Sequence, residues 1–95
     1  MIDIISEETE KQSVHHYCLL TQNYRYDLSI AFSHHFHGKS MVTSIQSGRM
    51  VLLCLEDIHS DQYWAPKLEI AEEDVQEIKN FFGLVLQSKQ FNEQY

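Results

Sequence analysis

Three of the six histidines lie in one short stretch, residues 34–39, with the sequence HHFHGK. Imidazole nitrogens bind zinc and transfer protons near neutral pH, so this spacing raises the question of a metal or catalytic site. A zinc site needs three or four ligand atoms that converge on one point, each about 2.0 to 2.3 Å from the ion. Whether these side chains converge depends on the backbone that carries them, because adjacent residues of a strand point to opposite faces.

Nucleophilic catalysis would need a cysteine or serine beside a histidine. Cys18 and several serines have histidines nearby in the sequence, but chance readily supplies such neighbours in a chain rich in serine and histidine. A thiol on a strand usually acts as a small packing group. The segment HHFHGK also lacks the flanking glycine and the spacing of a phosphate-binding Walker loop. We therefore predict no catalytic residue and favour a non-enzymatic protein.

Charged side chains in the middle of the chain are candidates for binding an anion. Between residues 12 and 55 the single acid is Asp27, against the three bases Arg25, Lys39 and Arg49, in a chain of net charge −7. These four residues form the candidate ligand-binding set. An ordinary cross-strand ion pair between Asp27 and Arg49 is the alternative interpretation. The negative total charge argues against nucleic acid as the main partner, since that affinity comes largely from Lys and Arg on phosphates.

The length of 95 residues and the composition indicate one folded domain. With 43% apolar residues, three glycines and one proline, the chain is typical of a globule. The acidic start and the lack of a long apolar run predict a cytoplasmic protein without a signal peptide or membrane span. We expect an N-terminal arm over residues 1–12, one domain over 13–89 and a tail over 90–95. Cys18 and Cys54 lack CxxC spacing and are expected to remain unbridged.

Hydrophobic alternation predicts an antiparallel sheet. The clearest strand covers residues 26–34, where every second side chain from Tyr26 to Phe32 is apolar. Segments 14–21, 40–46 and 50–55 are the other predicted strands. Two-residue turns that contain a glycine, His37-Gly38 and Ser47-Gly48, connect the second strand to the third and the third to the fourth. The sequence therefore predicts a four-stranded β-meander.

After residue 60 the pattern changes. Residues 63–70 are compatible with a short fifth strand, which Pro66 restricts to an edge because proline cannot donate to a ladder. In residues 72–88, apolar side chains recur every three or four positions after an acidic first turn. The predicted fold class is therefore α+β: a four- to five-stranded antiparallel meander with one C-terminal amphipathic helix packed on one face.

Two-residue turns would also define the register of the strands. They place Gln22 opposite Arg25, Phe36 opposite Lys39, and Gln46 opposite Arg49. In this register His34 points toward the helix, His35 toward the open face and His37 into the turn. Only His15 and His34 then approach each other, and two ligands are too few for a zinc site. We accordingly predict no metal and no cofactor.

The same register leaves an apolar patch on the face opposite the helix. Residues 50–55 are apolar on both faces, which indicates burial from two sides, whereas one helix covers one face. We therefore expect a homodimer or higher oligomer. Folding of the N-terminal arm, with Ile2, Ile4 and Ile5, over the same patch is the alternative. The predicted interface residues are Val42, Val51, Leu53, Trp64 and Leu84.

The elements Arg25-Tyr26-Asp27-Leu28, Phe36-His37-Gly38-Lys39 and Gln46-Ser47-Gly48-Arg49, followed by an acid-started helix, resemble an uncharacterised family of short cytosolic proteins from low-GC Gram-positive bacteria. The resemblance implies a compact cytosolic domain and supplies no activity or catalytic residue. The function favoured by the sequence is a self-associating protein-interaction module. The alternative is a binder of a small anion or nucleic acid through Arg25, Lys39 and Arg49, and a histidine metal site ranks third.

Overall fold

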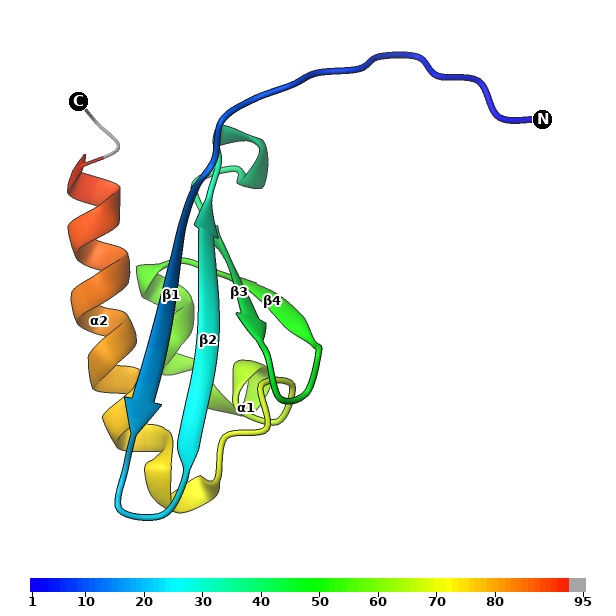
Figure 1. Cartoon of the computed structure of the whole chain (residues 1–95). Coiled ribbons are helices and arrows are strands. Elements are labelled where there is room, and N and C mark those ends of the chain that lie inside the picture. Colours follow the sequence, from blue (N-terminus) through cyan, green and yellow to red (C-terminus); the bar gives the residue numbers. More distant parts are fainter. Residues whose placement is uncertain (93–95) are drawn as a thin grey trace.

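The computed structural model describes the backbone of residues 1–92 and the side chains of residues 1–86. Four strands form one antiparallel sheet in the order β1-β2-β3-β4 (Figure 1). This confirms the predicted α+β meander with a C-terminal helix. The strands are β1 (Ser13–Leu20), β2 (Arg25–Phe32), β3 (Ser40–Ser44) and β4 (Met50–Leu53). The helices are η1 (His34–Phe36), η2 (Leu55–His59), α1 (Asp61–Trp64), η3 (Glu72–Asp74) and α2 (Val75–Asn92).

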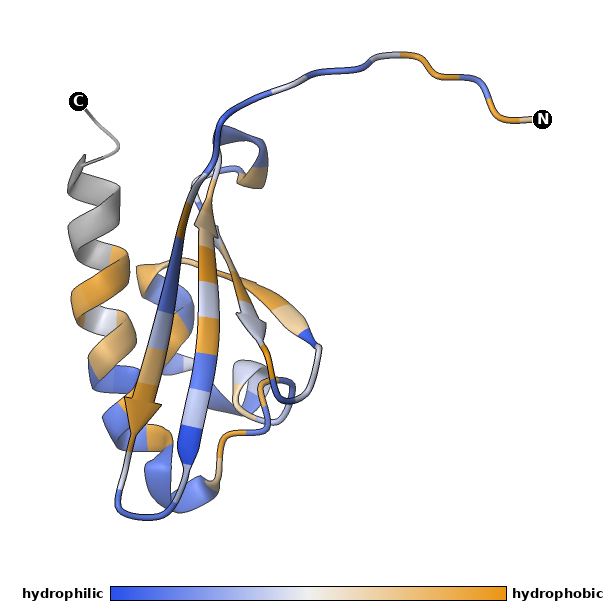
Figure 2. Cartoon of the chain, in the orientation of Figure 1, coloured by the Kyte–Doolittle hydropathy of each residue, from blue (hydrophilic) through white to orange (hydrophobic). Residues whose placement is uncertain are grey.

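The core lies between one face of the sheet and the helices. Strand β2 shows the reason, because its hydropathy alternates along its length (Figure 2) and its even-numbered residues from Tyr26 to Phe32 are all buried. From α2, Ile78, Phe82 and Leu86 are buried against this face. These three positions are four residues apart, which places their side chains along one side of the helix. Within the described part of the chain, no helix combines the length and apolar character needed to cross a membrane.

The register of the middle hairpin differs from the prediction and reverses the faces of β3 and β4. A two-residue turn places Phe32 opposite Thr43, but the structure pairs Phe32 with Ser40, a shift of three residues. The cause is that η1, His37 and Gly38 make the connection longer, with His37 at φ 57° and Gly38 at φ 81° turning the chain back. Because side chains alternate, an odd shift moves every side chain of the strand to the other face.

The outer two hairpins also shift, but by two residues, which leaves the faces unchanged. Leu20 lies opposite Arg25 instead of Asp27, and Thr43 lies opposite Met50 instead of Leu52. The side chains of β4 therefore lie on the opposite face from the predicted one, as those of β3 do. As a result Val42, Val51 and Leu53 are buried beneath the helices, and the prediction that they lie on the open face is wrong.

The predicted fifth strand is also wrong, because residues 61–70 form α1 and a turn. Local backbone bonds satisfy this segment: Ala65 donates to Asp61, Leu68 to Trp64 and Ile70 to Ala65. The Trp64 side chain is fully buried, and its indole N–H donates to the carbonyl of Ile58 at 3.2 Å. This buried anchor directs the segment into the helical layer instead of the sheet.

The N-terminal arm does not cover the sheet. Residues 1–12 have no helix or strand, and the arm runs away from the body of the protein (Figure 1). Ile2, Ile4 and Ile5 are all exposed. The thiols of Cys18 and Cys54 are free, as predicted, and sheet order explains this: Cys18 lies on β1, whereas Cys54 follows β4 at the opposite edge.

A buried carboxylate connects the turn between β1 and β2 to the start of α2. Asp74 accepts hydrogen bonds from the hydroxyl of Tyr26 at 2.7 Å and from the side-chain amide of Asn23 at 2.9 Å. Burial alone raises the pKa of Asp74, but hydrogen bonds from Tyr26, Asn23 and Thr21 outweigh it and hold the pKa below its usual value. The Tyr26 hydroxyl also accepts from the backbone N–H of Ala71 at 3.1 Å. Burial first, and then the Asp74 carboxylate, raise the pKa of Tyr26 to about 12.

We expect Tyr26→Phe to lower the free energy of unfolding at neutral pH by about 1–3 kcal/mol, because it removes one donor to a buried carboxylate and the acceptor of the Ala71 N–H. A carboxyl with a lowered folded-state pKa stabilises above its unfolded pKa of about 3.9, and this contribution is lost as pH falls through the folded pKa. The gap between wild type and variant should therefore narrow below about pH 4.

Urea titrations of the wild type and of Tyr26→Phe, one at neutral pH and one below about pH 4, measure the effect. The matched control is Tyr24→Phe, since Tyr24 is 56% exposed, and it should leave stability unchanged. Equal effects of the two substitutions would contradict the assigned role of the Tyr26 hydroxyl.

Candidate interaction surface

The part of the chain that the structure describes leaves one face of the sheet uncovered, the face opposite the helices, and we call it the open face. One row of it crosses all four strands, because Val14 lies opposite Ala31, Ala31 opposite Met41 and Met41 opposite Leu52. This row is apolar throughout. The full open face comprises Val14, His16, Cys18, Leu20, Arg25, Asp27, Ser29, Ala31, Met41, Thr43, Ile45, Met50 and Leu52.

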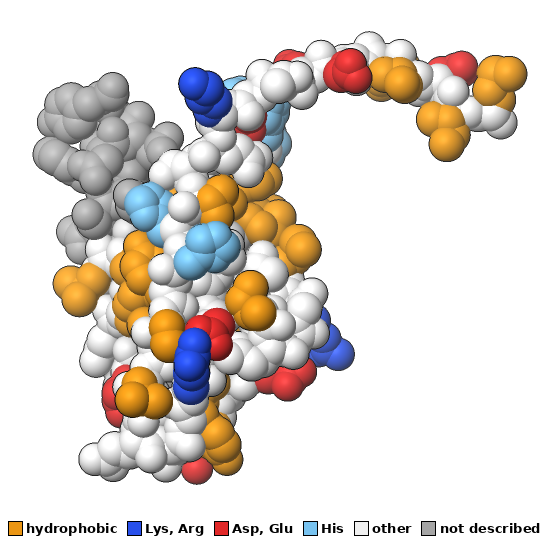
Figure 3. All heavy atoms as spheres, viewed as in Figure 1, with side chains coloured by type: hydrophobic (Ala, Val, Ile, Leu, Met, Phe, Trp, Pro, Cys, Tyr) orange, Lys and Arg blue, Asp and Glu red, His pale blue; other side chains and the backbone are white. Residues whose placement is uncertain are grey.

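Several apolar side chains of the open face are strongly exposed. Leu20 is 81% exposed, Ile45 58%, Met50 54% and Val14 46%. The space-filling view, in the orientation of Figure 1, shows hydrophobic side chains gathered over the strands with histidine and one pair of opposite charges among them (Figure 3). Such clustering on a folded surface marks an interaction site more often than scattered single apolar residues do.

The centre of the open face is lined by small side chains. Ser29 and Ala31 on β2 and Thr43 on β3 occupy adjacent positions there, with Ser29 opposite Thr43. All three are partly exposed. Short side chains at the centre let another layer approach closely, in the way that two sheets pack face to face about 10 Å apart.

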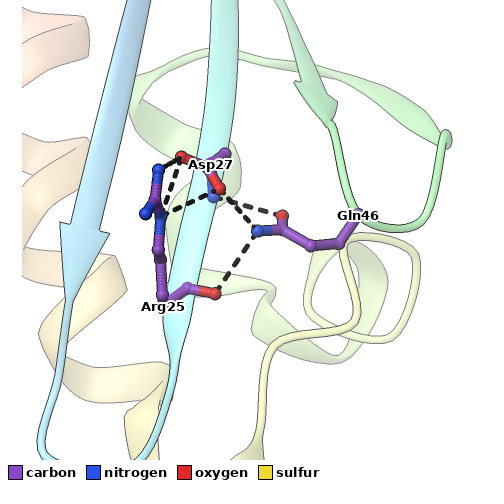
Figure 4. Close-up of polar contacts among 3 residues, drawn as sticks. All are labelled: Arg25, Asp27 and Gln46. Carbon is purple, nitrogen blue, oxygen red and sulfur yellow. Dashed lines mark hydrogen bonds and ion pairs between the residues drawn. The ribbon is translucent and has the colours of Figure 1, made fainter.

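One polar cluster lies at the end of the open face where β2 begins (Figure 4). The guanidinium of Arg25 donates to both carboxylate oxygens of Asp27, with Nε at 3.3 and 3.2 Å from them. The side-chain amide of Gln46 donates to Asp27 at 2.8 Å, and its oxygen accepts from the Asp27 backbone N–H at 3.1 Å. The hydrogen bonds from Arg25 hold the pKa of Asp27 below its usual range, and Asp27 in turn raises the pKa of Arg25. Gln46 thus occupies the place beside Asp27 that the sequence suggested for Arg49.

The three candidate anion-binding cations do not come together. Arg25 starts β2, whereas Lys39 precedes Ser40, which pairs with Phe32 at the other end of β2. Lys39 instead forms an ion pair with Asp57 at 2.9 Å, whose hydrogen bond is the main cause of its raised pKa. Arg49 directly precedes β4, in the turn between β3 and β4, and is exposed. Two of the three positive charges therefore have acidic partners within the chain, and no common anion site results among Arg25, Lys39 and Arg49.

The structure brings His34 and His35 together, contrary to the prediction that they diverge. Both belong to η1 and not to a strand, and their ring centroids are 4.1 Å apart. Two acids of the arm join them: Nε2 of His35 lies 2.9 Å from a carboxylate oxygen of Glu8, and Nδ1 of His34 lies 3.3 Å from one of Glu10. His15, expected near His34, instead packs against Tyr17 and Phe32.

Sequence reasoning missed Glu8 and Glu10, although a signal existed. With Ser13 opposite Phe32, the residues before β1 run past the end of β2 and reach the connection that contains η1. The hydroxyl of Ser33 donates to Glu10 and holds the pKa of that carboxyl below its usual value. The signal was that the residues before the first strand must pass this connection in an antiparallel hairpin, but only the observed register places both acids beside the histidines.

Most of the predicted interface residues are internal. Val42, Leu53 and Trp64 are fully buried, and Val51 is 3% exposed, so these side chains stabilise the single chain. Leu84, on α2, is 74% exposed, but it lies on the helical side of the molecule and not on the open face. The apolar residues that do lie on the open face are Val14, Leu20, Met41, Ile45, Met50 and Leu52.

The comparison with protein families decides the relationship of this chain. The model of the SAV0927-like family matches residues 5–84. The chain belongs to the SAV0927-like family. That family is uncharacterised and is named after a Staphylococcus aureus protein, so membership supplies no activity. The matched segment of the SAV0927-like family includes the whole sheet, the acids Glu8 and Glu10, and the first part of α2. No curated protein matches the chain.

Proposed function

We propose that the protein is a cytoplasmic, non-enzymatic interaction module that forms homodimers through the open face of its sheet. The observation that carries the proposal is the apolar row from Val14 through Ala31 and Met41 to Leu52, which no helix of the described residues covers and from which the arm turns away. Burial of apolar surface is the main driving force of protein association.

The charge distribution supports a second copy as the occupant. The chain carries a net charge of −7, so two copies repel each other at most orientations. On the open face, all of whose residues are described, the charged side chains are Arg25 and Asp27, which cancel. Depletion of charge relative to the remaining surface is a property of interface centres.

The shape and chemistry of the open face also suit two-fold symmetry. A two-fold interface uses the same patch on both copies and must therefore be complementary to itself. The apolar row, with the small central residues Ser29 and Ala31, can pack against the same row of a second copy. The neighbouring ion pair can also be self-complementary, with Arg25 of each copy facing Asp27 of the other. A face with a single sign of charge would fail this requirement.

The mass in solution tests the proposal. Light scattering should give twice the chain mass of 11.2 kDa for the wild type at micromolar concentration. Met50→Glu places two like charges in the interface, and because Met50 is 54% exposed the fold should be retained. We expect the dissociation constant of the dimer to be at least about tenfold higher for this variant than for the wild type, as measured by analytical ultracentrifugation over a range of concentrations.

The matched control is Leu84→Glu, which adds the same charge at a 74% exposed leucine of α2. It should leave the dimer intact. A wild-type mass of 11.2 kDa from micromolar to near-millimolar concentration would overturn the proposal. Dissociation by Leu84→Glu, with Met50→Glu still dimeric, would move the interface to the helical side and equally reject the open face.

A further inference from the structure

A second cluster, independent of the open face, joins the N-terminal arm to η1. Its members are Glu8 and Glu10 from the arm and His34 and His35 from η1. The carboxylate of Glu10 lies 3.3 Å from Nδ1 of His34 and 3.8 Å from Nε2 of His35, while Glu8 lies 2.9 Å from Nε2 of His35. Segments more than twenty residues apart in sequence thus direct four metal-ligating side chains to one place.

The local backbone explains why two consecutive histidines share a side. A 3-10 helix has three residues per turn, so neighbouring side chains diverge by about 120° instead of the opposite directions of a strand. Ser33 caps this helix, since its hydroxyl oxygen accepts from the backbone N–H of His35 at 3.1 Å. His37, in the left-handed region at φ 57°, ends the turn and lies outside the cluster.

We propose that Glu8, His34 and His35 form a site for a divalent transition metal ion, zinc above all, with Glu10 as the fourth donor. Zinc takes imidazole nitrogen and carboxylate oxygen in tetrahedral sites. Ligand atoms around such an ion stand about 3.3 Å apart when the bonds are about 2.0 to 2.1 Å long. One ligand atom each of Glu8, His34 and His35 already lies within 4.8 Å of the other two, so small side-chain rotations bring these three donors to the spacing that a single ion requires.

The surroundings of the cluster favour a cation. Two carboxylates offset the charge of a divalent ion, and the imidazoles supply the nitrogen donors that select zinc over magnesium or calcium. The Ser33 hydroxyl holds the Glu10 carboxylate in place, which is the outer-shell support that ligating carboxylates usually have. The exposure of His34 and Glu8 leaves the ion free to enter from solvent.

A bound ion would fasten the arm at residues 8–10 to the end of the sheet. Residues 1–12 form no helix or strand, and side-chain contacts of Glu8 and Glu10 connect the arm to η1 and Ser33. Lys11, the single lysine or arginine before Arg25, follows the proposed ligand Glu10 directly in the sequence. Tryptic cleavage after Lys11 therefore reports whether the arm is fastened, independently of the dimer.

The test is calorimetric titration of the metal-free protein with zinc chloride alone. We expect one zinc per chain with a micromolar or tighter dissociation constant. Glu8→Gln, His34→Asn and His35→Asn should each weaken binding by roughly 10- to 100-fold. His37→Asn is the matched control, because it removes a histidine of the same loop and because Asn tolerates the left-handed backbone. It should bind zinc as the wild type does.

Proteolysis supplies the second measurement. Zinc should slow the tryptic loss of residues 1–11 from the wild type and from His37→Asn, and should leave the rate for Glu8→Gln and His35→Asn unchanged. Glu8 lies in the arm outside the folded body, so its variant keeps the fold. Substoichiometric binding by the wild type would overturn the site. Equal weakening by His37→Asn and His35→Asn would do the same, because it shows general histidine affinity instead of a built site.

Discussion

Leu53→Glu is expected to unfold the protein. Leu53 is fully buried in β4, and removing its side chain from the core forfeits about 1.5–3 kcal/mol of hydrophobic stabilisation. A buried carboxylate without a partner costs several kcal/mol more. Because small domains are stable by only about 5–15 kcal/mol, the sum is a large fraction of the total. Far-UV circular dichroism and a urea titration measure the loss.

Leu52→Glu is the matched control for Leu53→Glu, since the two residues are adjacent on β4 and face opposite sides of the sheet. Leu52 lies partly exposed on the open face, so its variant should remain folded. The pair tests the register of the middle hairpin directly. If Leu52→Glu unfolds and Leu53→Glu stays folded, the observed register is wrong and the two-residue turn, which places Leu52 in the core, is correct.

Trp64→Ala should lower the free energy of unfolding by about 3–5 kcal/mol, the usual range for truncating a buried tryptophan or phenylalanine. The indole is fully buried, meets the ring of Phe82 edge-on at a centroid distance of 5.1 Å, and donates to the carbonyl of Ile58. Its removal leaves a cavity between α1 and α2 and an unpaired carbonyl. Chemical denaturation followed by circular dichroism gives the change without relying on the lost fluorophore.

The neighbouring substitution Tyr63→Ala serves as the control for Trp64→Ala. Tyr63 is 44% exposed on α1, so its truncation should cost well under half as much. If residues 63–70 formed an edge strand whose Trp64 contacted another copy, Trp64→Ala would change the mass in solution more than the stability. That result would contradict the burial of Trp64 within one chain.

Local patterns in the sequence were sufficient to predict the four strands and the C-terminal helix. The alternation from Tyr26 to Phe32 marks a half-buried strand, and the spacing of Ile78 and Phe82 marks a helix with one apolar side, because both periods follow from the backbone geometry of a single segment. The acids before α2 and the glycine turns add their own local signals. These features predicted the meander and the C-terminal helix, and both are confirmed. The family resemblance, which rested on three short motifs and the acid-started helix, is also confirmed.

What lay beyond the sequence was the relation between segments. Whether Val42 and Leu53 face the core depends on how many residues the connection after Phe32 occupies, and an odd change reverses both strands. Two-residue turns and longer connections with η1 are both compatible with HHFHGK, and only packing selects between them. Residues 61–70 are likewise compatible with a strand or a helix, and the packing of Trp64 against Phe82 selects the helix.

The candidate sites show the same division. Arg25 and Asp27 could be named from the sequence, but their pairing with each other and with Gln46 required the observed register. Glu8 and Glu10 meet His34 and His35 because β1 and β2 are aligned so that the arm passes η1. Residue types and the strongly periodic conformations of the four strands and the C-terminal helix are properties of single segments, which the sequence alone determined. Faces, partners and clusters depend on contacts between distant segments, and only the tertiary structure decided them.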